Sequence, residues 1–127
     1  MATADAQRST LRTDTLNGLH WLGIAAALVT AAIHLLLGVR LFPSGLGISF
    51  VLAGGGFVGA VVLVLIDYRR RAVYAAGIPF TLVQLVAWYV LNFAGGGRSF
   101  PGEVGTFGAI DKVAQVVLIA VLVALLR

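Results

Sequence analysis

The chain has 127 residues, of which 60% are hydrophobic and only 11% are charged, and its mean hydropathy is +1.01. About half of the residues of a soluble domain are apolar. The core of a 127-residue domain could not enclose the additional apolar residues of this chain, so the lipid bilayer must be part of the solvent. The sequence has no cysteine and only five acidic residues. It therefore excludes disulfides, thiolate metal sites, cysteine nucleophiles and chemistry that needs several carboxylates.

Residues 1–15 are polar and predict a short cytoplasmic N-terminal tail, followed by a transmembrane domain over residues 16–127. Apolar segments at 16–41, 46–68, 72–93 and 107–126 each have about the 20 residues that a helix needs to cross a membrane. None shows the alternation of a membrane β-strand. The first segment is longer than the apolar region of a signal peptide and lacks a small-residue cleavage site. The sequence thus predicts an all-α polytopic membrane protein, a bundle of four transmembrane helices.

The net charge of +4 comes mostly from arginines outside the apolar segments. No basic stripe with interleaved aromatic residues exists, so we expect no nucleic-acid binding. Arginines are typical of the cytoplasmic side of a membrane protein, and they predict a multi-pass protein of the cell membrane with both termini in the cytoplasm. With four spans, one side receives Arg8, Arg12, Arg69–Arg71 and Arg127, and the other side receives Arg40 and Arg98.

The second segment is rich in small residues, which allow helices in lipid to approach each other closely. Two pairs have the spacing of one helical turn, and they make up our helix-packing candidates: Gly55 with Gly59, and Gly56 with Ala60. One interpretation is a seam inside the bundle, against the first or third span. The other is the seam of a homodimer.

Polar residues inside spans are costly and often functional. The third segment carries Thr81, Gln84, Trp88 and Asn92 at spacings of 3, 4 and 4, which place them on one helix face. The first segment contributes His34, and the fourth carries Asp111 and Gln115 one turn apart. Since neighbouring spans run in opposite directions, these residues reach similar depths. The candidate polar cluster, which would be a proton or ligand site, comprises His34, Gln84, Trp88, Asn92, Asp111 and Gln115.

A competing interpretation places these residues at the membrane surface, and it is the one that the sequence favours. Asp111 would lie near a helix N-terminus, where a carboxylate is stabilised, and Trp88, Tyr89 and Asn92 would form an interfacial belt. Lys112 is turned by about 100° from Asp111 on a helix. We therefore expect Lys112 to extend to the surface rather than to pair with Asp111.

The two histidines, His20 and His34, have the separation with which one helix of a dihaem cytochrome b presents two axial ligands. Two haems need four histidines, and the sequence has two, so only a homodimer could supply them. A haem-binding homodimer is a remote alternative, and we predict no cofactor and no metal.

Three stretches resemble a family of small four-span membrane proteins of halophilic archaea, grouped as a domain of unknown function. They are Asp67–Arg71, Gly77–Gln84 and Trp88–Asn92. The resemblance covers most of the chain and implies a four-span fold without an established activity.

The absence of a nucleophile arrangement or cofactor motif predicts a protein that is not an enzyme. We expect an accessory or structural subunit of a membrane assembly, with the lipid bilayer and a membrane-protein partner or a second copy as its partners. The alternative is a small transporter or channel that uses the candidate polar cluster.

Overall fold

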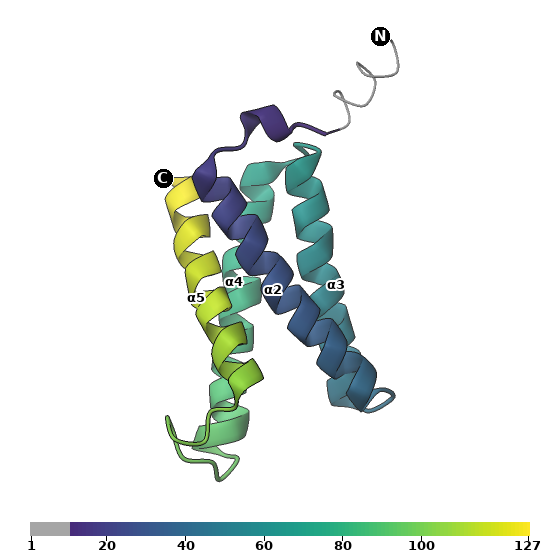
Figure 1. Ribbon diagram of the computed structural model, residues 1–127, viewed down its shortest axis with the longest axis vertical. Coiled ribbons are helices and arrows are strands. Elements are labelled where there is room, and N and C mark those ends of the chain that lie inside the picture. The colour runs from purple at the N-terminus through teal and green to yellow at the C-terminus, as the bar shows by residue number, and fades with distance from the viewer. Residues whose placement is uncertain (1–10) are drawn as a thin grey trace.

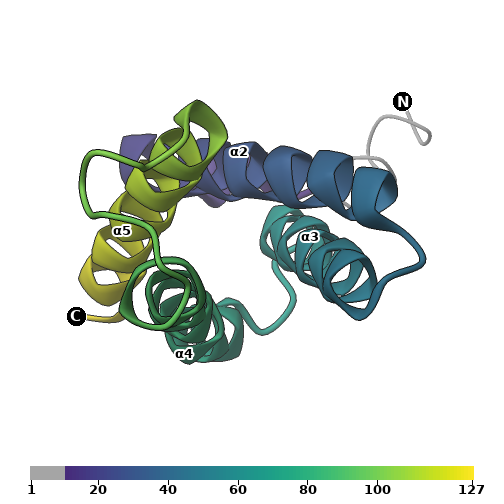
Figure 2. The ribbon, with the colours of Figure 1, turned by 90° about the horizontal axis from the view of Figure 1, so that it is seen from below.

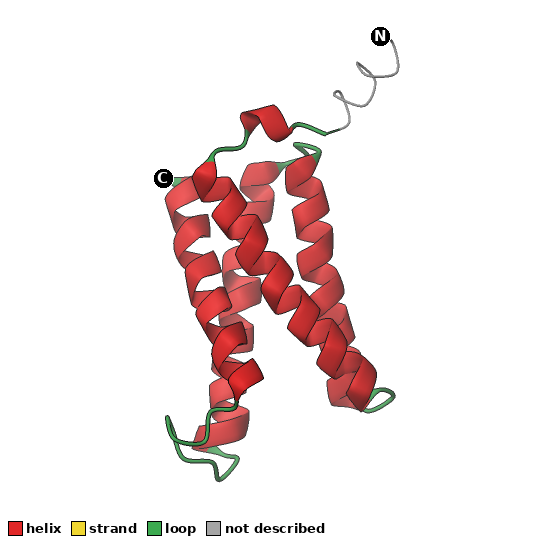
Figure 3. Ribbon diagram, viewed as in Figure 1, coloured by secondary structure: helices red, strands yellow, loops and turns green. Residues whose placement is uncertain are grey.

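The computed structural model describes residues 11–127 as four long helices joined by short connections (Figure 1; Figure 3). Within this range there is no strand. All four helices are long and apolar enough to cross a membrane, which confirms the all-α class and the four apolar helices. Residues 1–10, most of the predicted tail, lie outside the described part of the chain. The elements are η1 (Thr13–Thr15, a 3-10 helix), α2 (Gly18–Leu41), α3 (Gly45–Leu65), α4 (Arg70–Tyr89), η2 (Val90–Ala94, a π-helix that continues α4) and α5 (Thr106–Leu126).

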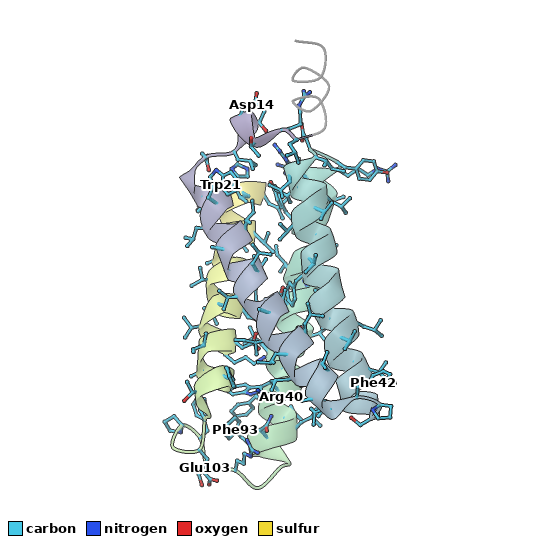
Figure 4. The ribbon with its side chains drawn as sticks, turned by 45° about the vertical axis from the view of Figure 1, so that its right-hand side comes forward. Asp14, Trp21, Arg40, Phe42, Phe93 and Glu103 are labelled. Atoms are coloured by element: carbon cyan, nitrogen blue, oxygen red, sulfur yellow. The ribbon has the colours of Figure 1, made fainter. Side chains whose placement is uncertain are left out.

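The helices run alternately up and down the bundle (Figure 1). The start of α2, the turn between α3 and α4 and the end of α5 lie at one end. The α2–α3 turn and the 95–105 loop lie at the opposite end, so Asp14 and Glu103 mark the two extremes (Figure 4). We call the first the arginine-rich end, because five of the seven described arginines belong to it: Arg12, Arg69, Arg70, Arg71 and Arg127.

Helix α2 is the element on which the bundle is assembled. It runs diagonally from the end of α5 to the start of α3 (Figure 1), and seen along the bundle it lies across one side (Figure 2). It packs closely against both α3 and α5, and α4 packs against α5. Helices α3 and α4 are the neighbours that touch each other least.

Glycines bring α2 and α3 together. A Cβ atom on Gly47 would lie 2.5 Å from the carbonyl carbon of Leu41, and one on Gly54 would lie 2.6 Å from Leu35 Cγ. A Cβ on Gly38 would meet Val51 at 2.7 Å. Such distances are far below ordinary van der Waals contact, so only glycine allows this crossing. In lipid, close packing of this kind replaces the hydrophobic effect as the force that joins helices.

The predicted glycine pairs point in different directions. Gly56 faces α4, where a Cβ would lie 2.8 Å from Phe80 Cζ, and Ala60 faces the space between the helices. A Cβ on Gly55 or Gly59 would meet no atom of the described residues within 4 Å. The interpretation of Gly55 and Gly59 as an internal seam is therefore wrong, because these two glycines face the outside of the bundle.

Side chains close the ends of the helices. Asn17 and His20 form a capping box at the start of α2, in which each side chain accepts a hydrogen bond from the other's backbone N–H at 3.2 Å. Ser44 Oγ accepts from the backbone N–H of Gly47 at the start of α3. These bonds satisfy amide groups that the first turn of a helix leaves without partners.

The arginine run caps helix C-termini. Arg70 Nε donates to the carbonyl oxygen of Val64 at 2.8 Å, and its Nη1 donates to Thr15 Oγ1 at 2.6 Å. Arg71 Nη2 donates to the carbonyl oxygen of Leu126 at 3.0 Å. The last carbonyls of a helix lack partners and carry partial negative charge, so these guanidinium groups stabilise the ends of α3 and α5.

We predict that Arg70→Ala lowers the free energy of unfolding in detergent by about 1–3 kcal/mol, because several hydrogen bonds to a charged group are lost. Arg69→Ala is the matched control: Arg69 is exposed and lies over the Tyr68 ring, so its loss should cost less than about 0.5 kcal/mol. Equal losses for both variants would contradict the capping role of Arg70.

Candidate functional site

Polar side chains from three helices meet in the interior of the bundle. Four of them are almost completely buried: Thr30 and Gln115 are 0% exposed, Asp111 is 4% exposed and His34 is 6% exposed. Since α2, α4 and α5 all contribute, the group joins the helices as well as filling the space between them. We call it the buried polar network, and it consists of Thr30, His34, Gln84, Asp111, Lys112 and Gln115.

The Asp111 carboxylate is at the centre of this network. Its Oδ1 accepts a hydrogen bond from the Thr30 hydroxyl across the α2–α5 contact. Its Oδ2 lies 2.7 Å from Lys112 Nζ. Each carboxylate oxygen therefore has its own donor, and the negative charge of this buried side chain is balanced.

The position of Lys112 differs from the expectation. Its Nζ donates to Gln115 Oε1 at 2.9 Å, lies 5.4 Å from the centre of the Trp88 ring, and contacts Asp111. The side chain is only 13% exposed. The prediction that Lys112 extends to the surface is wrong, because its long stem turns back to a carboxylate and an aromatic face that the interior offers.

His34, on α2, lies beside the Asp111 carboxylate of α5. Its Nδ1 is 2.8 Å from the Thr30 carbonyl oxygen and 3.6 Å from Asp111 Oδ1. With Nδ1–H donated to that carbonyl, Nε2 is the nitrogen that can accept a proton. The ring packs against Phe50 and Phe57 of α3, with centroids 5.3 and 6.0 Å away.

Gln115 connects the centre of the network to α4. Its Nε2 donates to Thr30 Oγ1 at 3.3 Å and to Gln84 Oε1 at 3.1 Å. Gln84 Nε2 in turn donates to the carbonyl oxygen of Phe80 in its own helix. The amides thus tie α2, α4 and α5 together through hydrogen bonds.

Two members of the candidate polar cluster are less closely connected. Trp88 touches the network only through its ring face, below Lys112. Asn92 Nδ2 donates to the carbonyl oxygen of Trp88 at 2.8 Å, within the wider turn that begins at Val90. The regular spacing of the polar stripe predicted one continuous face, but the π-helix changes the register before Asn92.

Tyr89 is 46% exposed near the opposite end of the bundle. It packs against Phe93 and Phe100, with ring centroids 5.8 and 5.7 Å away. This is the part of the predicted aromatic belt that lies on the surface.

Thr30 is the member of the network that sequence reasoning missed. It lies four residues before His34, on the same face of α2, and this spacing was the available signal. A threonine in an apolar helix is easily overlooked, because its hydroxyl often bonds to a carbonyl of its own helix.

The two histidines have different environments. His20 belongs to the capping box at the arginine-rich end, whereas His34 is enclosed by the network and two phenylalanine rings. A group as large as haem would have to displace side chains of α3 to reach His34, so the packing does not favour the haem hypothesis. Across residues 11–127, no three His, Asp or Glu side chains lie close enough together to hold a metal ion.

Residues 5–126 match a family of unknown function (DUF7475). The chain belongs to this family. No curated protein and no solved structure matches it. Membership confirms the resemblance to a family without an assigned activity; the expectation that its members are four-span proteins of halophilic archaea stays a prediction.

We predict that Lys112→Met lowers the free energy of unfolding by about 3–5 kcal/mol, because it leaves the buried Asp111 carboxylate without its counter-ion. Adding Asp111→Asn should recover part of this loss, so that the double-mutant cycle gives a coupling of about 1–3 kcal/mol. The measurement is reversible unfolding in mixed micelles.

The control cycle pairs Lys112→Met with Glu103→Gln, a carboxylate in the exposed loop. These two changes should add within about 0.5 kcal/mol. If Lys112→Met and Asp111→Asn also added within this limit, the Asp111 charge would be in contact with water, as the interfacial interpretation requires.

Proposed function

We propose that the chain is an integral membrane protein of the cell membrane, with four spans, and that it carries protons through the buried polar network. The observation that supports this proposal is Asp111, a carboxylate 4% exposed in the interior of an apolar bundle. Ionisable residues within spans are rare, face the bundle interior, pair with one another and mark ion and proton pathways. Asp111, Lys112 and His34 face the bundle interior and lie close to one another, which supports the proposal.

The proton would be held by His34. When Nε2 takes up a proton, the imidazolium lies beside Asp111, whose Oδ1 is 3.6 Å from Nδ1. The Lys112 ammonium occupies the other carboxylate oxygen at 2.7 Å. One carboxylate then faces two cations, the imidazolium and the ammonium. One proton enters and one leaves in each cycle.

We propose no enzymatic activity for this chain. Ser44, which caps the start of α3, and Ser49, within α3, donate hydrogen bonds from their hydroxyls to backbone carbonyls and not to a base. Nucleophilic catalysis by serine needs a base within hydrogen-bond reach. Transport across the membrane is therefore the better-supported function.

A second candidate function is that of an accessory subunit in a membrane assembly. The observation that favours it is the pair Gly55 and Gly59 on α3, which face open space and would accept a helix from outside at close range. The partner would be another membrane protein or a second copy of the chain.

We further propose that the arginine-rich end faces the cytoplasm, since arginines accumulate on that side. A cysteine introduced at Ser99 should react with a membrane-impermeant thiol reagent in intact cells, and one introduced at Ala72 should react only after lysis. The chain has no native cysteine, so the signal is specific. Labelling of Ala72→Cys alone in intact cells would reverse the orientation.

The transport proposal predicts a proton flux in liposomes that contain the purified chain and a pH-sensitive dye, driven by a potassium diffusion potential. His34→Gln should reduce the flux by at least about tenfold, because a positioned proton-transfer group contributes on the order of 10²–10⁴ in rate. Asp111→Asn should reduce it similarly, because it removes the carboxylate beside the imidazolium. Glu103→Gln, which removes an exposed carboxylate, should leave the flux unchanged.

Wild-type flux no greater than that of empty liposomes, or full flux in Asp111→Asn, would contradict proton transport. In that case, a stable foreign membrane protein that copurifies with the chain in mild detergent would favour the accessory-subunit function.

A further inference from the structure

A cavity of about 60 Å³ lies between the four helices, on the arginine-rich side of the buried polar network. Every helix contributes to its wall, and most of the side chains that line it are apolar. The cavity is not closed on all sides, consistent with the weak contact between α3 and α4. The residues on which the argument rests are His20, Phe57, Ala60, Tyr74 and Thr81.

Two hydroxyl groups in this wall have no partner. Tyr74 is 5% exposed and Thr81 is 0% exposed, and neither Tyr74 Oη nor Thr81 Oγ1 forms a hydrogen bond with any described residue. A buried hydroxyl without a hydrogen bond costs free energy. Both residues line the same cavity, so one kind of ligand would satisfy both.

The size of the cavity and the chemistry of its wall identify that ligand as water. A buried water needs roughly 10–15 Å³ of such space, whereas an apolar cavity that binds benzene has about 150 Å³. The cavity therefore has room for about four waters. A wholly apolar cavity would stay dry, but two unsatisfied hydroxyls supply the hydrogen-bond partners that ordered water requires.

We infer that this cavity is a water-binding site, and that its waters give His34 access to the arginine-rich end. The second half of the inference rests on the proposed transport function; the first does not. Tyr74 and Thr81 are seven residues apart on one face of α4, about 10 Å along the helix. Their hydroxyls are too distant to bond to each other, and a chain of waters spans this length.

The two ends of the cavity have suitable neighbours. At the arginine-rich end, the ring of His20 lines the cavity and lies 6.2 Å from that of Tyr74, centroid to centroid. At the inner end, Phe57 lines the cavity and also packs against His34. His34 does not itself line the cavity. Phe57 borders both, and a shift of its ring would let the waters reach His34.

The proton balance is that of a water chain. A proton that His34 Nε2 takes from the nearest water is replaced on that water by a proton from the next one. The last water takes its proton from the aqueous phase at the arginine-rich end. No side chain other than His34 changes its protonation state.

Hydration is tested with two variants that remove a hydroxyl and keep the volume, Tyr74→Phe and Thr81→Val, in the purified full chain. If the hydroxyls bind water, both variants should lower the midpoint of unfolding in detergent. If they are dry, their removal should leave the midpoint unchanged or raise it, which would overturn the inference. Tyr89→Phe, at an exposed tyrosine, is the control and should have no effect.

X-ray radiolytic labelling gives a second readout, because bound water produces hydroxyl radicals beside the side chains that it touches. Tyr74 should be labelled despite its burial, and Ala60→Leu, which fills the cavity, should reduce this labelling several-fold. Gly59→Leu places the same side chain at the neighbouring outward-facing position and should leave the labelling unchanged. Equal Tyr74 labelling in the wild type and in Ala60→Leu would contradict a hydrated cavity.

The link to transport is tested in the liposome assay. Ala60→Leu should reduce the proton flux several-fold, and Gly59→Leu should leave it unchanged. If Ala60→Leu does not fold, Thr81→Val takes its place and should also reduce the flux. If Ala60→Leu and Thr81→Val conduct like the wild type while Asp111→Asn does not, the water access is wrong and proton transport stands. If Asp111→Asn conducts fully, proton transport is wrong, and the labelling of Tyr74 still decides whether the cavity holds water.

Discussion

The paired charge of Asp111 is the constraint on which the rest of the structure depends. An unpaired carboxylate in an apolar bundle would be very costly, so every group that satisfies it has a fixed place. Thr30 must face α5, Lys112 must turn inward, and Gln115 must lie between them. The crossing of α2 and α5, and the attachment of α4 through Gln84, follow from these requirements.

The bundle is consequently held by two different kinds of contact. Helices α2 and α3 meet closely at the glycines Gly38, Gly47 and Gly54. Helices α2, α4 and α5 meet through the buried polar network. Between α3 and α4 neither kind of contact is well developed, and both helices line the cavity.

The four helices were predictable because hydropathy and length depend on each residue separately. The meeting of His34, Gln84, Asp111 and Gln115 at similar depth followed from helix direction alone. Lys112 was predicted wrongly, because helix geometry fixes where a side chain starts and not where a long, flexible stem ends. The direction of Gly55 and Gly59 could not be deduced either: a small-residue pair has the same pattern whether its partner helix belongs to the bundle or not.

The ion pair between the adjacent residues Asp111 and Lys112 also affects how α5 enters the membrane. A lone Asp or Lys costs an inserting helix at most about 2.5–3.5 kcal/mol, the figure for the helix centre, and Asp111 and Lys112 lie nearer the start of α5. Because Asp111 and Lys112 are adjacent, their ion pair can form within α5 before any other helix is present. The translocation machinery would then receive a neutral segment, and the assembly of α5 with α2 need not precede its insertion. An equally polar pair divided between two helices would lack this independence during biosynthesis.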